Sequence, residues 1–207
     1  MTTTSEIDVL IVGAGPVGIS AAMLLHKMGH SVRIVERREG PQCAPAAHVI
    51  NARTFEVWRQ IGVNVDHLRS LAQDPQAAGQ VHWVTKLGGT VLGSLPYERQ
   101  GDEMLALTPT PLRNLAQHIL EPKLVDELSS MSIAVEYSTQ WLSMVQGDEN
   151  VDSTVALNGR EEIITSRFVI GCDGASSAVR RVSGIVMEGP DNLQSFAMIH
   201  FSADLTS

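Results

Sequence analysis

The feature that most constrains the fold is a set of three glycines near the start of the chain, Gly13, Gly15 and Gly18, in the spacing G-x-G-x-x-G. They follow Val9–Val12, an apolar run typical of a strand buried in a parallel sheet. At such a turn the first glycine lets the chain leave the strand sharply, the second leaves room for a pyrophosphate, and the third lets the helix pack closely on the strand. The spacing therefore predicts a nucleotide-binding βαβ unit.

The residues that follow complete this unit. A helix is predicted over residues 16–28, because Pro16 suits the first turn of a helix and Gly29 can end it. The free N–H groups and the positive dipole end of that helix would face the phosphates. A second strand is predicted over residues 31–35.

Glu36, at the end of the second strand, indicates which nucleotide is bound. An acid about 20 residues beyond the glycines accepts hydrogen bonds from the ribose hydroxyls of an adenosine. Its charge would repel a 2′-phosphate, so the predicted ligand is FAD or NAD rather than NADP. Strand, glycines, helix, second strand and acid occur in order, which makes the pattern far more specific than the glycine spacing alone.

Composition narrows the class of partner. The chain has 207 residues, 43% of them hydrophobic, which is enough for a substantial core. Its formal net charge of −8, without a basic stripe, argues against nucleic acid. The first strand begins close to Met1, so no signal peptide is expected, and no apolar run approaches the ~18 residues of a membrane span.

Cysteine and histidine spacing point away from disulfides and metals. Cys43 and Cys172 lack a C-x-x-C partner, which favours reduced thiols and a cytoplasmic protein. His26 and His30 are four residues apart, but Gly29 should end the helix between them, and no H-E-x-x-H motif occurs. No metal site is therefore expected.

The middle of the chain mixes helices with a hairpin. Apolar residues at helical spacing predict a helix over residues 53–61. Two short strands, over residues 80–85 and 90–95, are separated by a four-residue connection with two glycines, which predicts an antiparallel hairpin that belongs to a second layer. A long helix is predicted over residues 112–128, with Pro111 in its first turn and with Pro122 kinking or splitting it.

Short strands dominate the last third, and Asn158-Gly159 favours a tight hairpin between two of them. The segment Gly171–Ser177 is a second strand-to-helix turn with glycines, and a helix is predicted over residues 179–182. Asp173 in this turn either caps that helix or contacts the ligand. A final strand is predicted over residues 196–205, after earlier strands over residues 133–137, 139–145, 154–157, 163–165 and 168–170.

Several segments together resemble one known family. The similarity lies, in order and spacing, in GAGPVG, VERREGP, NARTFEVWRQIGV, LAQHILEPKLVDEL and GCDGASSAVRR. They resemble the FAD-dependent aromatic hydroxylases of the p-hydroxybenzoate hydroxylase fold. Within that family the chain is most similar to phenol and chlorophenol monooxygenases, which MEGPDNLQSFAMIHFSADL also resembles. The resemblance implies an α/β fold, a Rossmann-like FAD-binding domain with an inserted antiparallel β layer and the start of a substrate domain.

The resemblance also implies site residues. Glu36 would bind the adenosine ribose, with Arg37 beside it, and Gln117 would contact the cofactor. Asp173 would touch FAD and help with the nicotinamide nucleotide. Arg53 is either a solvated charge or faces the anionic ligand, and the resemblance places it near the flavin. The pyrophosphate would lie on the glycine turn, formed by Gly13, Ala14, Gly15, Pro16, Val17 and Gly18.

The family comparison yields a domain division. Residues 1–184 would form the FAD-binding domain, with residues 78–110 contributing a hairpin to the second layer, and residues 185–207 would begin the substrate domain. Family members continue well past this point, so the chain is expected to be the N-terminal part of such an enzyme. Ala46 stands where the family usually has the arginine of Pro-Arg-Ala, so one cation on the phosphate side is missing.

The implied activity is hydroxylation of a phenolic ring with FAD, NAD(P)H and O₂. The alternative is a non-catalytic remnant that binds FAD or another nucleotide. The expected partner is a small phenolic substrate, not nucleic acid or membrane, and a homodimer of the full-length form is compatible with the resemblance. No residue can be named as a catalytic base. Candidates for the substrate pocket, each equally compatible with packing or surface, are Trp83, Tyr97, Arg113, His200 and Phe201.

Overall fold

A computed structural model describes residues 7–97, 100–190 and 194–195 of the chain. The predicted βαβ unit is present: β1 (Ile7–Val12), α1 (Pro16–Lys27) and β2 (Val32–Val35) follow one another, and β1 pairs with β2 in parallel. Gly29, just after α1, has a φ of +90°, a left-handed conformation that glycine adopts without steric cost. Glycine is therefore suited to end this helix.

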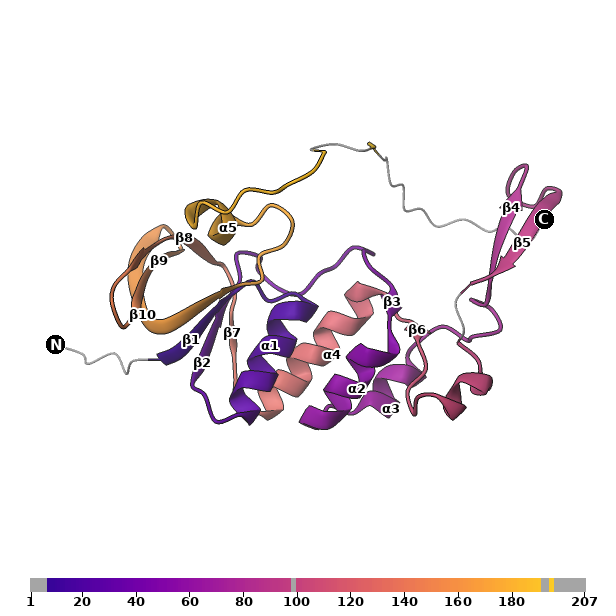
Figure 1. Ribbon diagram of the computed structural model, residues 1–207, viewed down its shortest axis with the longest axis horizontal. Helices are drawn as coiled ribbons and strands as arrows, with labels where there is room; N and C mark the ends of the chain where they lie inside the picture. Colours follow the sequence, from indigo (N-terminus) through magenta and orange to yellow (C-terminus); the bar gives the residue numbers. More distant parts are fainter. Residues whose placement is uncertain (1–6, 98–99, 191–193, 196–207) are drawn as a thin grey trace.

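The main sheet has six strands in the order β7-β2-β1-β10-β9-β8 (Figure 1). The pairs that join β7, β2, β1 and β10 are parallel, whereas β10, β9 and β8 form an antiparallel meander. The parallel half carries the nucleotide-binding unit, and the meander extends the sheet beyond it. The additional strands are β7 (Val135–Glu136), β8 (Thr139–Gln146), β9 (Val151–Leu157) and β10 (Arg160–Gly171).

Strand β10 corrects the sequence prediction, which had two separate strands over residues 163–165 and 168–170. A single strand runs through both. Ser166 explains the continuity, because it pairs with Val151 of β9 on one side and with Ile7 of β1 on the other. The polar residues Ser166 and Arg167 are thus held in the strand by two neighbours that local periodicity does not reveal.

The helices α1, α4 (Gln117–Ser130), α2 (Ala52–Ile61) and α3 (Val65–Ser70) lie on one side of the main sheet, with α1 next to the strands β1 and β2 (Figure 1). Helix α1 contacts both α4 and α2, and α2 contacts α3. The predicted apolar stripe of α2 is confirmed, and it lies in the main core with the buried side chains of β1 and α1. Its members Phe55, Trp58 and Ile61 are almost completely buried.

The long helix predicted from residue 112 begins later, at Gln117. The preceding residues Arg113–Asn114 form β6, which pairs antiparallel with β3 (Val49–Ile50). Pro122 does not split α4. Because the helix begins at Gln117, this proline lies only in its second turn, and its missing N–H removes one hydrogen bond near the helix end.

The predicted inserted hairpin is confirmed as a separate two-stranded sheet, β4 (Gln80–Val84) and β5 (Val91–Pro96). It projects from the end of the molecule opposite to β8–β10 (Figure 1). A 3₁₀ helix, η1 (Asp102–Ala106), follows it, and α5 (Ala178–Val182) contacts β8. The architecture is thus the expected mixed α/β fold with an antiparallel insertion.

The domain division at residue 184 stays a prediction, and the strand predicted over residues 196–205 lies outside the described residues. Within the described parts of the chain, no helix combines the length and apolar character needed to cross a membrane.

Candidate functional site

A cavity of about 360 Å³ opens at the carboxyl ends of β1 and β2. Parallel strands that meet at one sheet edge bring the residues that follow them together, which is why ligands of open α/β folds bind there. The cavity collects six residues predicted from the sequence: Gly13, Gly15, Glu36, Arg37, Gln117 and Asp173.

The three motif glycines have different physical roles. A Cβ on Gly13, whose φ is +102°, would lie 2.4 Å from the carbonyl oxygen of Cys172, and one on Gly18 would lie 1.9 Å from the carbonyl oxygen of Gly13. Packing within the protein therefore requires both. A Cβ on Gly15 would meet only Oε1 of Glu121, at 3.9 Å. Gly15 is the one whose missing side chain leaves space on the cavity side.

The N-terminus of α1 is free to receive an anion. Gly15 is the N-cap and offers no side-chain oxygen to the first-turn N–H groups, and the first turn contains no acidic residue. Uncapped N–H groups and the positive end of the helix dipole favour a negative ligand such as a phosphate. The residues at this turn thus fit a pyrophosphate beside Gly15.

Glu36 is 6% exposed and lies at the cavity with both carboxylate oxygens engaged. Oε2 accepts hydrogen bonds from the Ala14 N–H (2.9 Å) and Arg38 Nη2 (3.2 Å), and Oε1 accepts one from the Arg38 N–H (3.0 Å). Burial alone would raise the pKa of this carboxyl, but the hydrogen bonds from Arg38 and Ala14 outweigh it and hold the pKa below its ordinary value. Glu36 is therefore an ionised acceptor.

Arg38 and Glu121 are cavity residues that the sequence analysis missed. The Arg38 guanidinium lies between two carboxylates, 3.2 Å from Glu36 Oε1 and 3.2 Å from Glu121 Oε2. Glu121 is fully buried and also accepts a hydrogen bond from Gln117 Nε2 at 2.6 Å. The only sequence signal for Glu121 was its i,i+4 spacing from Gln117, which places both on one side of a helix.

Asp173 acts as a cap, one of the two roles predicted for it. Its carboxylate accepts hydrogen bonds from the Ser177 hydroxyl (2.6 Å) and from the N–H groups of Ala178 (2.6 Å) and Val179 (3.2 Å) at the start of α5. Burial opposes ionisation, but these hydrogen bonds outweigh it and lower its pKa. Asp173 also lines the cavity, so capping the helix fixes the turn at that wall.

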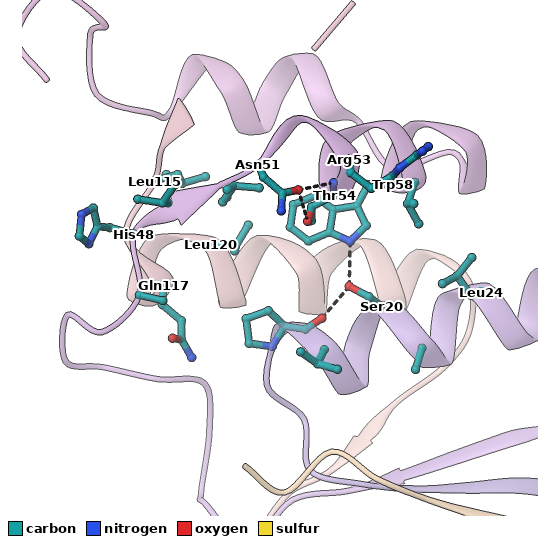
Figure 2. A pocket seen from close by; sticks show the side chains of 17 residues that line it. Ser20, Leu24, His48, Asn51, Arg53, Thr54, Trp58, Leu115, Gln117 and Leu120 are labelled. Atoms are coloured by element: carbon teal, nitrogen blue, oxygen red, sulfur yellow. Dashed lines mark hydrogen bonds between the residues drawn. The ribbon is translucent and has the colours of Figure 1, made fainter. Parts of the chain in front are cut away.

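A second cavity, of about 500 Å³, lies between α1, α2, β3 and the start of α4 (Figure 2). Trp58 at its wall donates from Nε1 to the Ser20 hydroxyl (2.8 Å), which donates to the Pro16 carbonyl (2.6 Å). Figure 2 shows Gln117 at one end of this cavity, away from Trp58. Gln117 lines both cavities, so it lies on the border between them, which is called here the junction of the two cavities.

Three of the remaining five predicted cofactor residues fall on this second side. Pro16, Val17 and Arg53 line the second cavity, whereas Ala14 and Gly18 line neither. The Arg53 side chain is 79% exposed and forms an ion pair with Glu56 at 3.3 Å. It is thus largely solvated and still borders the cavity.

The three pocket candidates among the described residues, Trp83, Tyr97 and Arg113, lie outside both cavities. Trp83 is 51% exposed on the hairpin, and the Arg113 guanidinium donates to the carbonyl oxygens of Gln100 and Leu112. His200 and Phe201 lie outside the described residues. In the part of the chain that the structure describes, no cluster of three or more metal-ligating side chains occurs.

The strand, glycine turn, uncapped helix and terminal acid define a dinucleotide-binding α/β domain. The sequence matches the FAD binding domain family over residues 6–207, and the chain belongs to this family. The expected fold and FAD as the cofactor are thereby confirmed.

Known relatives are longer than this chain. It is 32% identical over 211 residues to 2,4-dichlorophenol 6-monooxygenase of Delftia acidovorans, covering 99% of this chain and 36% of that protein. It is 31% identical over 211 residues to aklavinone 12-hydroxylase of Streptomyces peucetius, covering 99% and 43%. The solved structure of the flavin-dependent monooxygenase PieE, in complex with FAD and substrate, matches with a TM-score of 0.83 and 29% identity, over 90% of this chain and 33% of that one. The chain thus spans less than half of the length of each.

Proposed function

We propose that the complete protein is an FAD-dependent monooxygenase that hydroxylates a phenolic ring. In the balanced reaction one oxygen atom of O₂ enters the ring, the other leaves as water, and NAD(P)H supplies the two electrons. The observation that carries this proposal is the cavity where Gly15 and Glu36 meet at the carboxyl ends of β1 and β2. The named activities of the relatives support the choice of reaction.

Each cavity would hold a different part of FAD. The N-terminus of α1, beside Gly15, would bind the pyrophosphate, and Glu36 would accept from the adenosine ribose. Gln117, where the two cavities meet, would contact the middle of the cofactor, and Arg53 would lie towards the flavin. When bound, FAD would carry electrons from NAD(P)H to O₂, while the protein places the groups and excludes water.

Glu36→Ala is expected to weaken FAD binding by about tenfold to a hundredfold. The variant loses a charged acceptor for two ribose hydrogen bonds, each worth roughly 1.5–3 kcal/mol. The net loss of binding free energy is expected to be smaller than their sum, because the Glu36 carboxylate also accepts a hydrogen bond from Arg38. The measurement is the Kd of FAD from the quenching of its fluorescence by the complete protein. Glu162→Ala is the matched control, since Glu162 lines neither cavity. Equal affinity in the Glu36 variant and wild type would remove Glu36 from the adenosine site.

Activity is tested by NAD(P)H oxidation in the complete, FAD-loaded protein, with and without phenols. The proposal expects phenol-stimulated oxidation and a hydroxylated product identified by mass spectrometry. The competing idea, a non-catalytic nucleotide-binding remnant, expects bound FAD without either result. Lack of both stimulation and product with every phenol and with aklavinone would therefore end the monooxygenase proposal.

The proposed substrates are neutral or halogenated phenols. A strongly anionic substrate usually needs a bidentate arginine in a buried pocket. Arg113, one candidate for the substrate pocket, instead donates guanidinium hydrogen bonds to backbone carbonyl oxygens. A product screen over phenol, chlorophenols, hydroxybenzoates and aklavinone decides the class, and a preference for a hydroxybenzoate would overturn this choice.

We also propose a cytoplasmic, homodimeric enzyme. Both cysteines are free, and burial, together with the neighbouring Asp173 charge, raises the pKa of the Cys172 thiol, so this thiol stays protonated and unreactive. The molar mass of the complete protein in solution tests the dimer.

A further inference from the structure

Glu121 is the most deeply buried acid of the site, with no exposed surface. Its Oε2 accepts hydrogen bonds from the Gln42 N–H (2.7 Å) and from Arg38 Nη1 (3.2 Å), and its Oε1 accepts one from Gln117 Nε2 (2.6 Å). The same Oε1 is the nearest atom to the bare Cα side of Gly15. A buried carboxylate therefore stands opposite the glycine at which a pyrophosphate would bind.

The contact with Glu121 determines which way the amide of Gln117 is turned. An ionised carboxylate can only accept hydrogen bonds, so it selects the amide nitrogen of its neighbour and excludes the amide oxygen. The nitrogen of Gln117 is directed to Glu121, and its carbonyl oxygen remains available at the junction of the two cavities. A ligand that meets Gln117 is thus offered an acceptor, which suits a hydroxyl donor.

The other oxygen of Glu121 anchors the loop after β2. It binds the Gln42 backbone and the Arg38 guanidinium, and Arg38 in turn contacts the Gln42 side chain (3.1 Å) and Glu36. The polar chain Glu36–Arg38–Glu121–Gln117 therefore runs from the predicted ribose contact to the junction of the cavities. Helix α4 is connected in this way to the end of β2.

We propose that Glu121 is a positioning residue for the cofactor: its buried carboxylate holds Gln117 with the carbonyl oxygen turned to a hydroxyl group of FAD. The inference rests on the proposed function, because it assumes that FAD occupies the junction of the two cavities. The observed hydrogen-bond partners of Glu121 are Gln117, Gln42 and Arg38.

Glu121→Gln isolates the orientation effect. The new amide can keep its oxygen towards Gln42 and Arg38, so the loop stays anchored, while its NH₂ group faces Gln117. Two NH₂ groups cannot bond to each other, so Gln117 must turn its carbonyl inward and present a donor to the cofactor. The expected result is roughly tenfold weaker binding of FAD to the complete protein, because about one hydrogen bond between Gln117 and the cofactor is lost.

Glu127→Gln is the matched control. Glu127 lies on the same helix, accepts a hydrogen bond from a backbone N–H, that of Asn64 (3.1 Å), and lines neither cavity. It undergoes the same chemical change without touching Gln117. This variant is expected to bind FAD like wild type. Backbone hydrogen exchange at Gln42, measured by mass spectrometry, checks that the loop is still anchored in Glu121→Gln.

A double-mutant cycle separates positioning from a general structural role. If Glu121 acts by orienting Gln117, Glu121→Gln should cost nothing further once Gln117→Ala has removed the amide. If its role is only structural, the two losses in FAD affinity should multiply. Multiplying losses, or wild-type affinity in Glu121→Gln, would overturn the proposal.

A readout without FAD keeps this test apart from the proposed function. In the cofactor-free complete protein labelled with ¹⁵N-glutamine, the Gln117 side-chain amide resonance, assigned by its loss in Gln117→Ala, should move in Glu121→Gln and stay in place in Glu127→Gln. An unmoved resonance contradicts the orienting role. A third outcome is that wild-type protein binds no FAD, while the Gln117 resonance still moves in Glu121→Gln. That outcome would refute the proposed function and the role of Glu121 towards the cofactor, but it would support the orientation of Gln117 by Glu121.

Discussion

Replacing Gly15 with valine is expected to weaken FAD binding about a hundredfold or more while the domain remains folded. A Cβ at this position meets nothing closer than Glu121 Oε1 at 3.9 Å, so the protein itself leaves room for a Cβ. The added atoms stand in front of the uncapped N-terminus of α1, where the pyrophosphate would sit. At least two hydrogen bonds to a charged group would be lost, each worth roughly 1.5–3 kcal/mol.

The measurement is the flavin content of the purified complete protein together with the Kd of FAD. Gly15→Ala adds only the Cβ and should give a smaller loss, so the two variants form a graded series. Circular dichroism and the melting temperature without cofactor should match wild type in both. A folded Gly15→Val protein with wild-type affinity would show that FAD does not lie at this helix end.

Gly18→Ala is expected to damage the fold itself. A Cβ here would lie 1.9 Å from the carbonyl oxygen of Gly13, and neither backbone segment can move without separating α1 from the turn after β1. The cost should be about 3 kcal/mol or more, although Gly→Ala within an open helix normally stabilises by about 1 kcal/mol. For a domain of this size the melting temperature should fall by roughly 6–12 °C.

Gly93→Ala is the control for this second variant, because a Cβ on Gly93 meets nothing within 4 Å and that glycine lies on the hairpin. Thermal unfolding of the cofactor-free protein compares the two. Adding FAD should not restore the Gly18 variant to wild-type stability, because the clash lies within the protein. A Gly18→Ala protein as stable as wild type would mean that α1 is not packed on β1 as closely as described.

Much of the site could be predicted from local sequence. One βαβ unit contains the glycine spacing, Pro16 and the acid at position 36. Within such a unit the residue type at each of these positions is set by the local turn, helix start or strand end. The apolar stripe of α2 was predictable for the same reason, because helical periodicity is a local property. The family resemblance then related Gln117 and Asp173 to the same cofactor, and both line the cavity.

Other features depend on partners that are distant in sequence. Strand β10 is continuous because Ser166 pairs with two other strands, and α4 begins at Gln117 because Arg113–Asn114 pairs with β3. Local patterns predicted two strands and a longer helix in these places. Backbone hydrogen bonds to a neighbouring strand outweighed the local propensity in both.

The sequence by itself determined the nucleotide-binding unit, its preference for a ligand without a 2′-phosphate and the family. Only the tertiary structure decided which glycine faces the ligand and which two are required by packing. It also revealed that Glu121, 83 positions from Arg38, shares that guanidinium with Glu36 and accepts a hydrogen bond from the Gln117 amide. The physical reason is that a periodic pattern reports which face of an element is buried, whereas hydrogen bonds and close contacts depend on what the folded chain brings against that face.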